Sequence, residues 1–102
     1  MKEIEVIREK LSTSELFAQL AEECAELCHA ALKMRRVLSK DNPTPISPVD
    51  AYENVHEEIA DTLLVLKVLG YDCHLSHYYE MMSRKAQRWA SRLDDKDKTD
   101  GD

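Results

Sequence analysis

Acidic side chains interrupt two of the most hydrophobic stretches of this 102-residue chain. The first stretch, AEECAELCHAALK, covers residues 21–33, and the second, HEEIADTLLVLKVL, covers residues 56–69. Their acids are Glu22, Glu23 and Glu26 in the first stretch and Glu57, Glu58 and Asp61 in the second. Each stretch contains a pair of carboxylates three positions apart, and this spacing places both members of a pair on one side of a helix.

The two pairs are expected at the edge of the apolar helix faces. At about 100° per residue, Glu23 falls on the border of its apolar arc with Glu26 beside it, and Glu58 and Asp61 both fall beside Val65. An ionised carboxylate near a core is costly unless it is paired or binds a metal. Oxygen ligands suit a hard divalent cation such as Mg²⁺, or Mn²⁺ in its place. The pattern therefore predicts a metal site formed by Glu23, Glu26, Glu58 and Asp61.

A second interpretation of the acid pairs stays open. Glu pairs at this spacing are common on solvated helix surfaces, and cations such as Lys33 and Lys67 are available as partners. Periodicity alone does not separate a metal site from a charged surface.

A basic run near the C-terminus could bind phosphates. Lys85, Arg88 and Arg92 share one helix face beside Trp89, and Arg84 lies nearby. Cations also stabilise the C-terminal end of a helix and pair with an acidic tail, so a structural role is the alternative.

Four helical segments are expected to carry these residues. They span residues 2–11, 13–39, 48–70 and 73–93, and Ser12 with Glu15 forms a capping box before the second. Residues 40–50 contain three prolines and are expected to form a loop. The second segment has an apolar stripe of Leu16, Leu20, Cys24, Leu27, Ala31, Met34 and Leu38. The last has a stripe of Leu75, Tyr78, Tyr79, Met82, Ala86, Trp89 and Leu93.

Length and charge restrict the class of protein. The sequence indicates an all-α fold, a bundle of about four helices in one domain over residues 1–93, followed by a disordered charged tail over residues 94–102. The segment TLLVLKVL is apolar nearly all round, which predicts completion of the bundle by homodimerisation, with a dimer of dimers as an extension. A net charge of −6 argues against a nucleic-acid partner, and no stretch is apolar enough to span a membrane. Three cysteines without dense spacing, and no signal peptide, favour a cytoplasmic protein with reduced thiols.

Three stretches together resemble the MazG-like superfamily of all-α nucleoside triphosphate pyrophosphatases. They are EECAELCHAALKMRR, NVHEEIADTLLVLKVL and KAQRWASRL, and the resemblance covers about residues 16–93. It implies a homodimer or homotetramer that holds Mg²⁺ with Glu23, Glu26, Glu58 and Asp61. It also implies hydrolysis of a nucleoside triphosphate to the monophosphate and pyrophosphate.

The resemblance extends to other positions with two departures. Lys85 and Arg92 look like the family's Lys and Arg on the last helix, and Glu22 and Glu57 are candidate catalytic residues that position or deprotonate water. Many relatives carry an Asn between that Lys and Arg, and this chain has none. The connection between the acid pairs is also long, and its Asn42 and Thr44 are candidates to contact a base or ribose.

Two other functions compete with this one. Glu26 with His29, and Glu53 with His56, have the spacing of a di-iron carboxylate bundle. A non-catalytic helical dimerisation or adaptor module would explain the apolar third segment without a metal. Cys24 and Cys28, and the aromatic residues of the last segment, are expected to be core residues rather than ligands.

Overall fold

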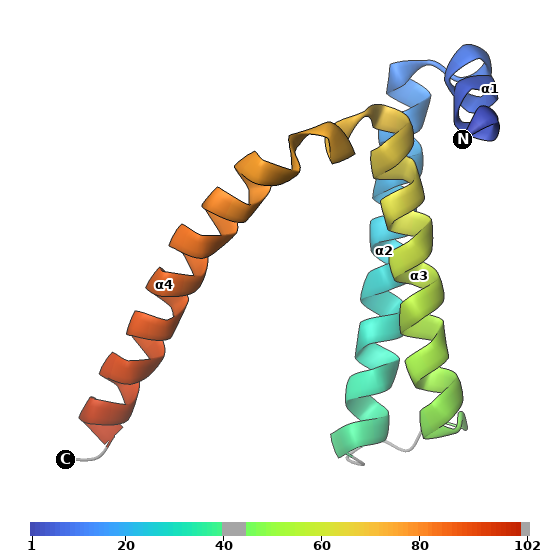
Figure 1. Ribbon diagram of the computed structural model, residues 1–102. Coiled ribbons are helices and arrows are strands. Elements are labelled where there is room, and N and C mark those ends of the chain that lie inside the picture. Colours follow the sequence, from blue (N-terminus) through green and yellow to red (C-terminus); the bar gives the residue numbers. More distant parts are fainter. Residues whose placement is uncertain (40–44, 101–102) are drawn as a thin grey trace. The chain divides into compact units, whose positions relative to one another are not determined.

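The chain is all-helical throughout the part that the structure describes. The computed structural model describes residues 1–39 and 45–100, with the side chains of residues 97–100 excepted. Its helices are α1 (Lys2–Lys10), α2 (Thr13–Ser39), α3 (Pro48–Leu69), the short 3₁₀ helix η1 (Tyr71–His74) and α4 (Leu75–Asp100) (Figure 1). No strand occurs in these described ranges. The predicted all-α class is confirmed, whereas Asn42 and Thr44 lie outside the described residues.

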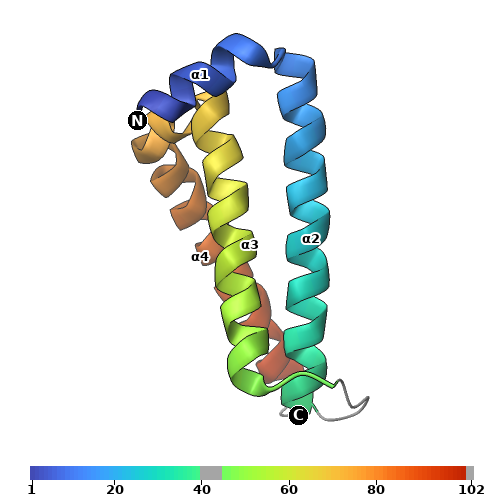
Figure 2. The ribbon, with the colours of Figure 1, turned by 90° about the vertical axis from the view of Figure 1, so that its right-hand side faces the viewer.

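The chain forms two compact units, Met1–Tyr71 and Asp72–Asp102, which are described separately. In the first unit α2 and α3 run antiparallel side by side, and α1 lies across the end where α2 begins and α3 finishes (Figure 2). The second unit contains η1 from Asp72 onward and α4. A single domain over residues 1–93 stays a prediction.

The start of α2 is fixed by a reciprocal pair of hydrogen bonds. The backbone N–H of Glu15 donates to Ser12 Oγ at 3.0 Å, and the backbone N–H of Ser12 donates to Glu15 Oε2 at 2.9 Å. These bonds satisfy two donors that a helix N-terminus would otherwise leave unpaired. The predicted capping box is confirmed.

Both ends of α3 also follow from local sequence. At its start the backbone N–H of Asp50 donates to Ser47 Oγ at 3.1 Å, and Pro48 occupies the first turn. At its end Gly70 has φ 88°, a left-handed conformation that glycine adopts without steric cost. Arg8 of α1 donates from Nε to the carbonyl oxygen of Val68 at 2.8 Å and from Nη2 to that of Lys67 at 2.9 Å. These bonds place a cation at the negative end of α3 and attach α1 to it.

A seam of buried and half-buried positions joins α2 to α3. On α2 the seam positions alternate by four and three residues through Leu16, Leu20, Glu23, Leu27, Ala30, Met34 and Val37. On α3 they are Ala51, Val55, Glu58, Thr62, Val65 and Leu69. Because this spacing averages 3.5 residues, it keeps one line of side chains toward the neighbouring helix. One glutamate from each helix therefore lies within an otherwise largely apolar seam.

The predicted apolar stripe of α2 is wrong in three places. Cys24, Ala31 and Leu38 are exposed, and Leu38 retains 70% of its accessible surface. The contact with α3 follows the line through Glu23, Ala30 and Val37 instead, one residue earlier in each case. Cys24 and Cys28 are consequently exposed free thiols rather than core residues.

The last helix is longer and more exposed than the sequence indicated. We expected it to end near Leu93 with a disordered tail, but α4 continues through Asp100, because neither Gly nor Pro interrupts residues 94–100. Residues 101–102 of that tail lie outside the described range. Tyr79 and Trp89 were expected in a core but are 68% and 64% exposed. Their unit is a single long helix preceded by one 3₁₀ turn, so it has no second layer to cover the stripe.

None of the helices in residues 1–39 and 45–100 combines the length and apolar character needed to cross a membrane.

Candidate metal centre

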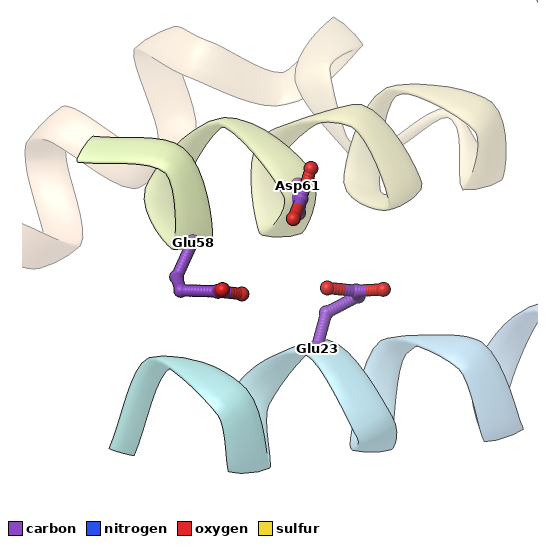
Figure 3. Close-up of side chains that lie close together, drawn as sticks. All are labelled: Glu23, Glu58 and Asp61. Carbon is purple, nitrogen blue, oxygen red and sulfur yellow. The ribbon is translucent and has the colours of Figure 1, made fainter. Parts of the chain in front are cut away.

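Three predicted ligands converge between α2 and α3. Glu23 points from α2 toward α3, and Glu58 and Asp61 project from adjacent turns of α3 (Figure 3). One carboxylate oxygen from each residue lies within 4.8 Å of one from each of the others. We refer to Glu23, Glu58 and Asp61 as the acidic triad.

The triad lies at the edge of the seam rather than on an open surface. Glu23 and Glu58 are half-buried, whereas Asp61 is exposed. Burial raises the pKa of Glu58, and the carboxylates of Asp61, Glu26, Glu23 and Glu57 raise it further. Both causes act in the same direction because each disfavours the ionised form. The folded chain therefore holds negative charge here at a cost that a bound cation would offset.

A glutamine that the sequence analysis did not select holds one ligand. Gln19 donates from Nε2 to Glu23 Oε1 at 2.8 Å, and the Gln19 side chain is half-buried. Gln19 precedes Glu23 by four residues, a spacing at which side chains on a helix meet, so this contact was open to sequence reasoning. In α3, Thr62 Oγ1 donates to the backbone carbonyl oxygen of Glu58 at 2.9 Å. The Gln19 bond thus orients the carboxylate of Glu23, whereas the Thr62 bond contacts only the backbone of Glu58.

The other predicted acids surround the triad. Glu26 is not part of the three-residue group, although its charge contributes to the raised pKa of Glu58. Glu57 acts on Glu58 in the same way, and Glu22 is exposed. A fourth ligand role for Glu26 and catalytic roles for Glu22 and Glu57 stay predictions.

The basic residues belong to the second unit. Lys85, Arg88 and Arg92 are exposed on α4. Lys85 and Arg88, with Arg84 and Met81, line a pocket of about 250 Å³ along this helix. The predicted cationic face exists on α4, and its participation in the acidic site stays a prediction.

The chemistry of the triad fits a hard divalent cation. Its donors are carboxylate oxygens, which Mg²⁺ prefers. In an octahedral Mg²⁺ site adjacent ligands lie about 3 Å apart and opposite ligands about 4.2 Å apart, so side-chain rotation would have to bring these three oxygens closer together. Three protein ligands would leave positions for water or phosphate oxygens. The site could thus hold a metal together with a phosphorylated ligand.

The alternative of a di-iron carboxylate site, which would use His29 and His56, has less structural support. His56 packs edge-to-face against Tyr52, with ring centroids 4.6 Å apart. Within the described ranges, the only group of three or more closely spaced potential ligands is the acidic triad, and it includes neither His29 nor His56. The geometry therefore favours an all-carboxylate site over a di-iron arrangement.

Comparisons of the chain with models of protein families, with curated proteins and with solved structures find no match.

Proposed function

We propose that the chain is a Mg²⁺-dependent nucleoside triphosphate pyrophosphohydrolase of the MazG-like class. It would convert an NTP or dNTP and water into the nucleoside monophosphate and pyrophosphate. The observation that supports this most directly is the convergence of Glu23, Glu58 and Asp61 between two helices. Acids that remain half-buried next to one another are better explained by a cation than by packing.

The proposed roles divide among three sets of residues. The acidic triad, with Glu26, would bind Mg²⁺, which on binding neutralises triphosphate charge and aligns the reacting groups. Glu22 and Glu57 flank the ligands and would orient the attacking water or accept its proton. Cations on α4 would hold the phosphates and stabilise the leaving pyrophosphate; these are Lys85, Arg88 and Arg92.

We further propose that the active form is a homodimer or homotetramer. The described chain buries only a few apolar side chains: Ile4, Leu16, Ala30, Ala51, Val65 and Val68. Large apolar side chains remain exposed on all three long helices, and they include Phe17, Leu32, Ile59, Leu63, Met82 and Trp89. Surfaces of this kind are typical of protein–protein contacts.

Pyrophosphate release provides the test. The purified chain would be assayed with canonical and modified NTPs and dNTPs, in Mg²⁺ and in EDTA. We expect Mg²⁺-dependent release of pyrophosphate and the monophosphate from one or a few nucleotides. A folded protein that neither hydrolyses any of them nor binds Mg²⁺ in calorimetry would contradict the proposal.

The exposed apolar surfaces also support a second candidate, a non-catalytic dimerisation or adaptor module. Under that alternative, neutralising the triad would leave function intact and stabilise the fold by removing repulsion. Loss of Mg²⁺ binding on neutralisation would instead favour the enzyme.

A further inference from the structure

An apolar pocket opens beside the acidic triad within the first unit. It has a volume of about 270 Å³ and lies among α1, α2 and α3. Ile7 lines it from α1, Leu11 from the residue that follows α1, Leu16 from α2 and Leu64 from α3. Ile7 also packs against the small core formed by Ile4, Leu16 and Val68, so α1 is held in place as one wall.

The same pocket has a polar end that it shares with the candidate metal centre. Glu23 and Asp61 line it, and so does Gln19, whose Nε2 donates to Glu23. A primary amide has two N–H donors and one carbonyl acceptor. With one donor used on Glu23, the amide of Gln19 still offers a donor and an acceptor to a ligand in the pocket.

The charge of the lining restricts the ligand group that can enter. Among the described lining residues none is cationic and two are carboxylates, so a phosphate group is disfavoured inside the pocket. An uncharged, largely apolar group is favoured instead, provided that its polar edge can reach Gln19.

The size of the pocket restricts that group further. Pockets that enclose a whole small ligand usually measure about 300–1,000 Å³. A cavity of about 270 Å³ suits one ring system rather than a complete nucleotide. Such a ring would lie beside Glu23 and Asp61 of the proposed metal centre.

We infer that this pocket binds the nucleobase of the substrate and that Gln19 contacts the polar edge of the base. The inference rests on the proposed nucleotide function, and it assigns substrate selection to α1 and to the ends of α2 and α3 nearest to it. Asn and Gln side chains recognise bases by pairing one donor and one acceptor with the base edge. Gln19 would therefore couple base recognition to the orientation of Glu23.

Binding of two probes separates the pocket from the metal centre. Inorganic tripolyphosphate carries the phosphate chain without a base, and α,β-methylene nucleoside triphosphates carry both without being hydrolysed at that bond. Calorimetry in Mg²⁺ would give the ratio of nucleotide affinity to tripolyphosphate affinity for each variant. Leu64→Trp fills the pocket at a position that is already 43% exposed. Val6→Trp is the control, because Val6 is 48% exposed and does not line the pocket.

We expect Leu64→Trp to lower the affinity ratio at least tenfold, whereas Val6→Trp leaves it within twofold of wild type. A ratio that is equal in Leu64→Trp and wild type would overturn the pocket assignment. Tight Mg²⁺-dependent binding of tripolyphosphate with no added affinity for any nucleotide would overturn it while leaving the metal centre intact. Failure of both probes to bind the folded wild type would instead contradict the proposed function, and the pocket assignment with it.

Gln19→Met tests the role of the amide, because methionine has a similar length without the hydrogen bonds. Contact with the base predicts a lower affinity ratio and a changed ranking of the bases. If Gln19 acted only through Glu23, both probes would weaken equally and the ratio would stay constant. That constant ratio would overturn the proposed contact.

Discussion

Two glutamates occupy seam positions at which the surrounding residues are mostly apolar. Glu23 and Glu58 are half-buried there, and Asp61 brings a third carboxylate within 4.8 Å. The raised pKa of Glu58 shows that the ionised form is disfavoured both by burial and by its acidic neighbours. Because the metal-free fold disfavours the ionised form of Glu58, we propose that a cation binds between these three carboxylates.

Neutralising the triad should abolish metal-dependent turnover without unfolding the chain. We expect Glu23→Gln and Asp61→Asn each to lower Mg²⁺ affinity and turnover by about a hundredfold or more, because each removes a charged ligand. Glu26→Gln should have a smaller effect, since Glu26 lies outside the three-residue group. Calorimetry and pyrophosphate release would measure the two quantities.

Glu9→Gln provides the control for these substitutions. It makes the same change at an exposed position of α1. Turnover of Asp61→Asn close to that of Glu9→Gln would exclude Asp61 as a ligand.

The metal-free protein should become less stable as the pH rises through the titration of Glu58. The raised pKa means that folded Glu58 keeps its proton at a pH where the unfolded chain has lost it. Between these two pKa values the folded state binds more protons, so the free energy of unfolding decreases as the pH rises. Below both pKa values this destabilisation is absent. Urea unfolding in EDTA, from about pH 4 to about pH 7, would measure it.

Glu58→Gln removes this titration and serves as the reference. It should be more stable than wild type at about pH 7, and the difference should shrink toward about pH 4. A difference that does not depend on pH would show that Glu58 is not the group responsible.

At the scale of elements, α1 is attached to the antiparallel pair of α2 and α3 by few interactions. Arg8 bonds to two carbonyl oxygens at the end of α3, and Ile4 and Ile7 pack on the small core. These contacts form at the last turn of α3, which ends at Gly70 in a left-handed conformation. The position of α1, and with it one wall of the apolar pocket, thus depends on how α3 ends.

Removing the Arg8 guanidinium should loosen α1. We expect Arg8→Met to destabilise the first unit by about 1 kcal/mol, since two hydrogen bonds to backbone carbonyls are lost while the apolar stem is largely kept. Hydrogen exchange should accelerate in α1 and in the last turn of α3, but not near Ala51 at the far end of α3. Lys10→Met is the control, as it removes a cation from the same helix. Equal effects of the two variants would argue against the Arg8 bonds as the attachment.

At the scale of the whole molecule, many large apolar side chains of the described chain remain exposed. Six apolar residues of the described chain are buried, whereas α3 alone exposes Ile59, Leu63 and Leu64 by 40–59%. Burial of such surface is the main favourable contribution to association. The free surface of α3 is therefore the region where we expect a second copy to bind.

A charge on this surface should disrupt self-association. We expect Leu63→Glu to weaken the assembly by about a hundredfold or more, because an unpaired carboxylate would be buried between the subunits. Light scattering across a concentration series would show smaller particles than for wild type. Val6→Glu, at a 48% exposed position on α1, is the control. An unchanged mass for Leu63→Glu would place the interface elsewhere.

The helices and their ends were predictable because they depend on neighbours in the sequence. The Ser12–Glu15 capping box, Pro48 in the first turn of α3 and the left-handed Gly70 all involve residues within a few positions of one another. Helical spacing likewise predicted that Glu58 and Asp61 would share one side of α3. The end of α4 was not predicted correctly, because a run of charged residues is compatible both with a disordered tail and with a solvated helix.

The sequence alone determined the helical class and the two acid pairs, since both follow from spacing along single helices. Only the tertiary structure decided which line of α2 residues faces α3. An apolar stripe drawn on an isolated helix does not show whether the contact line lies one residue earlier. That shift exposes Cys24 and Leu38 and brings Glu23 into the seam. The Arg8 attachment and the pocket beside Glu23 and Asp61 also required it, because they join residues that are far apart in the chain.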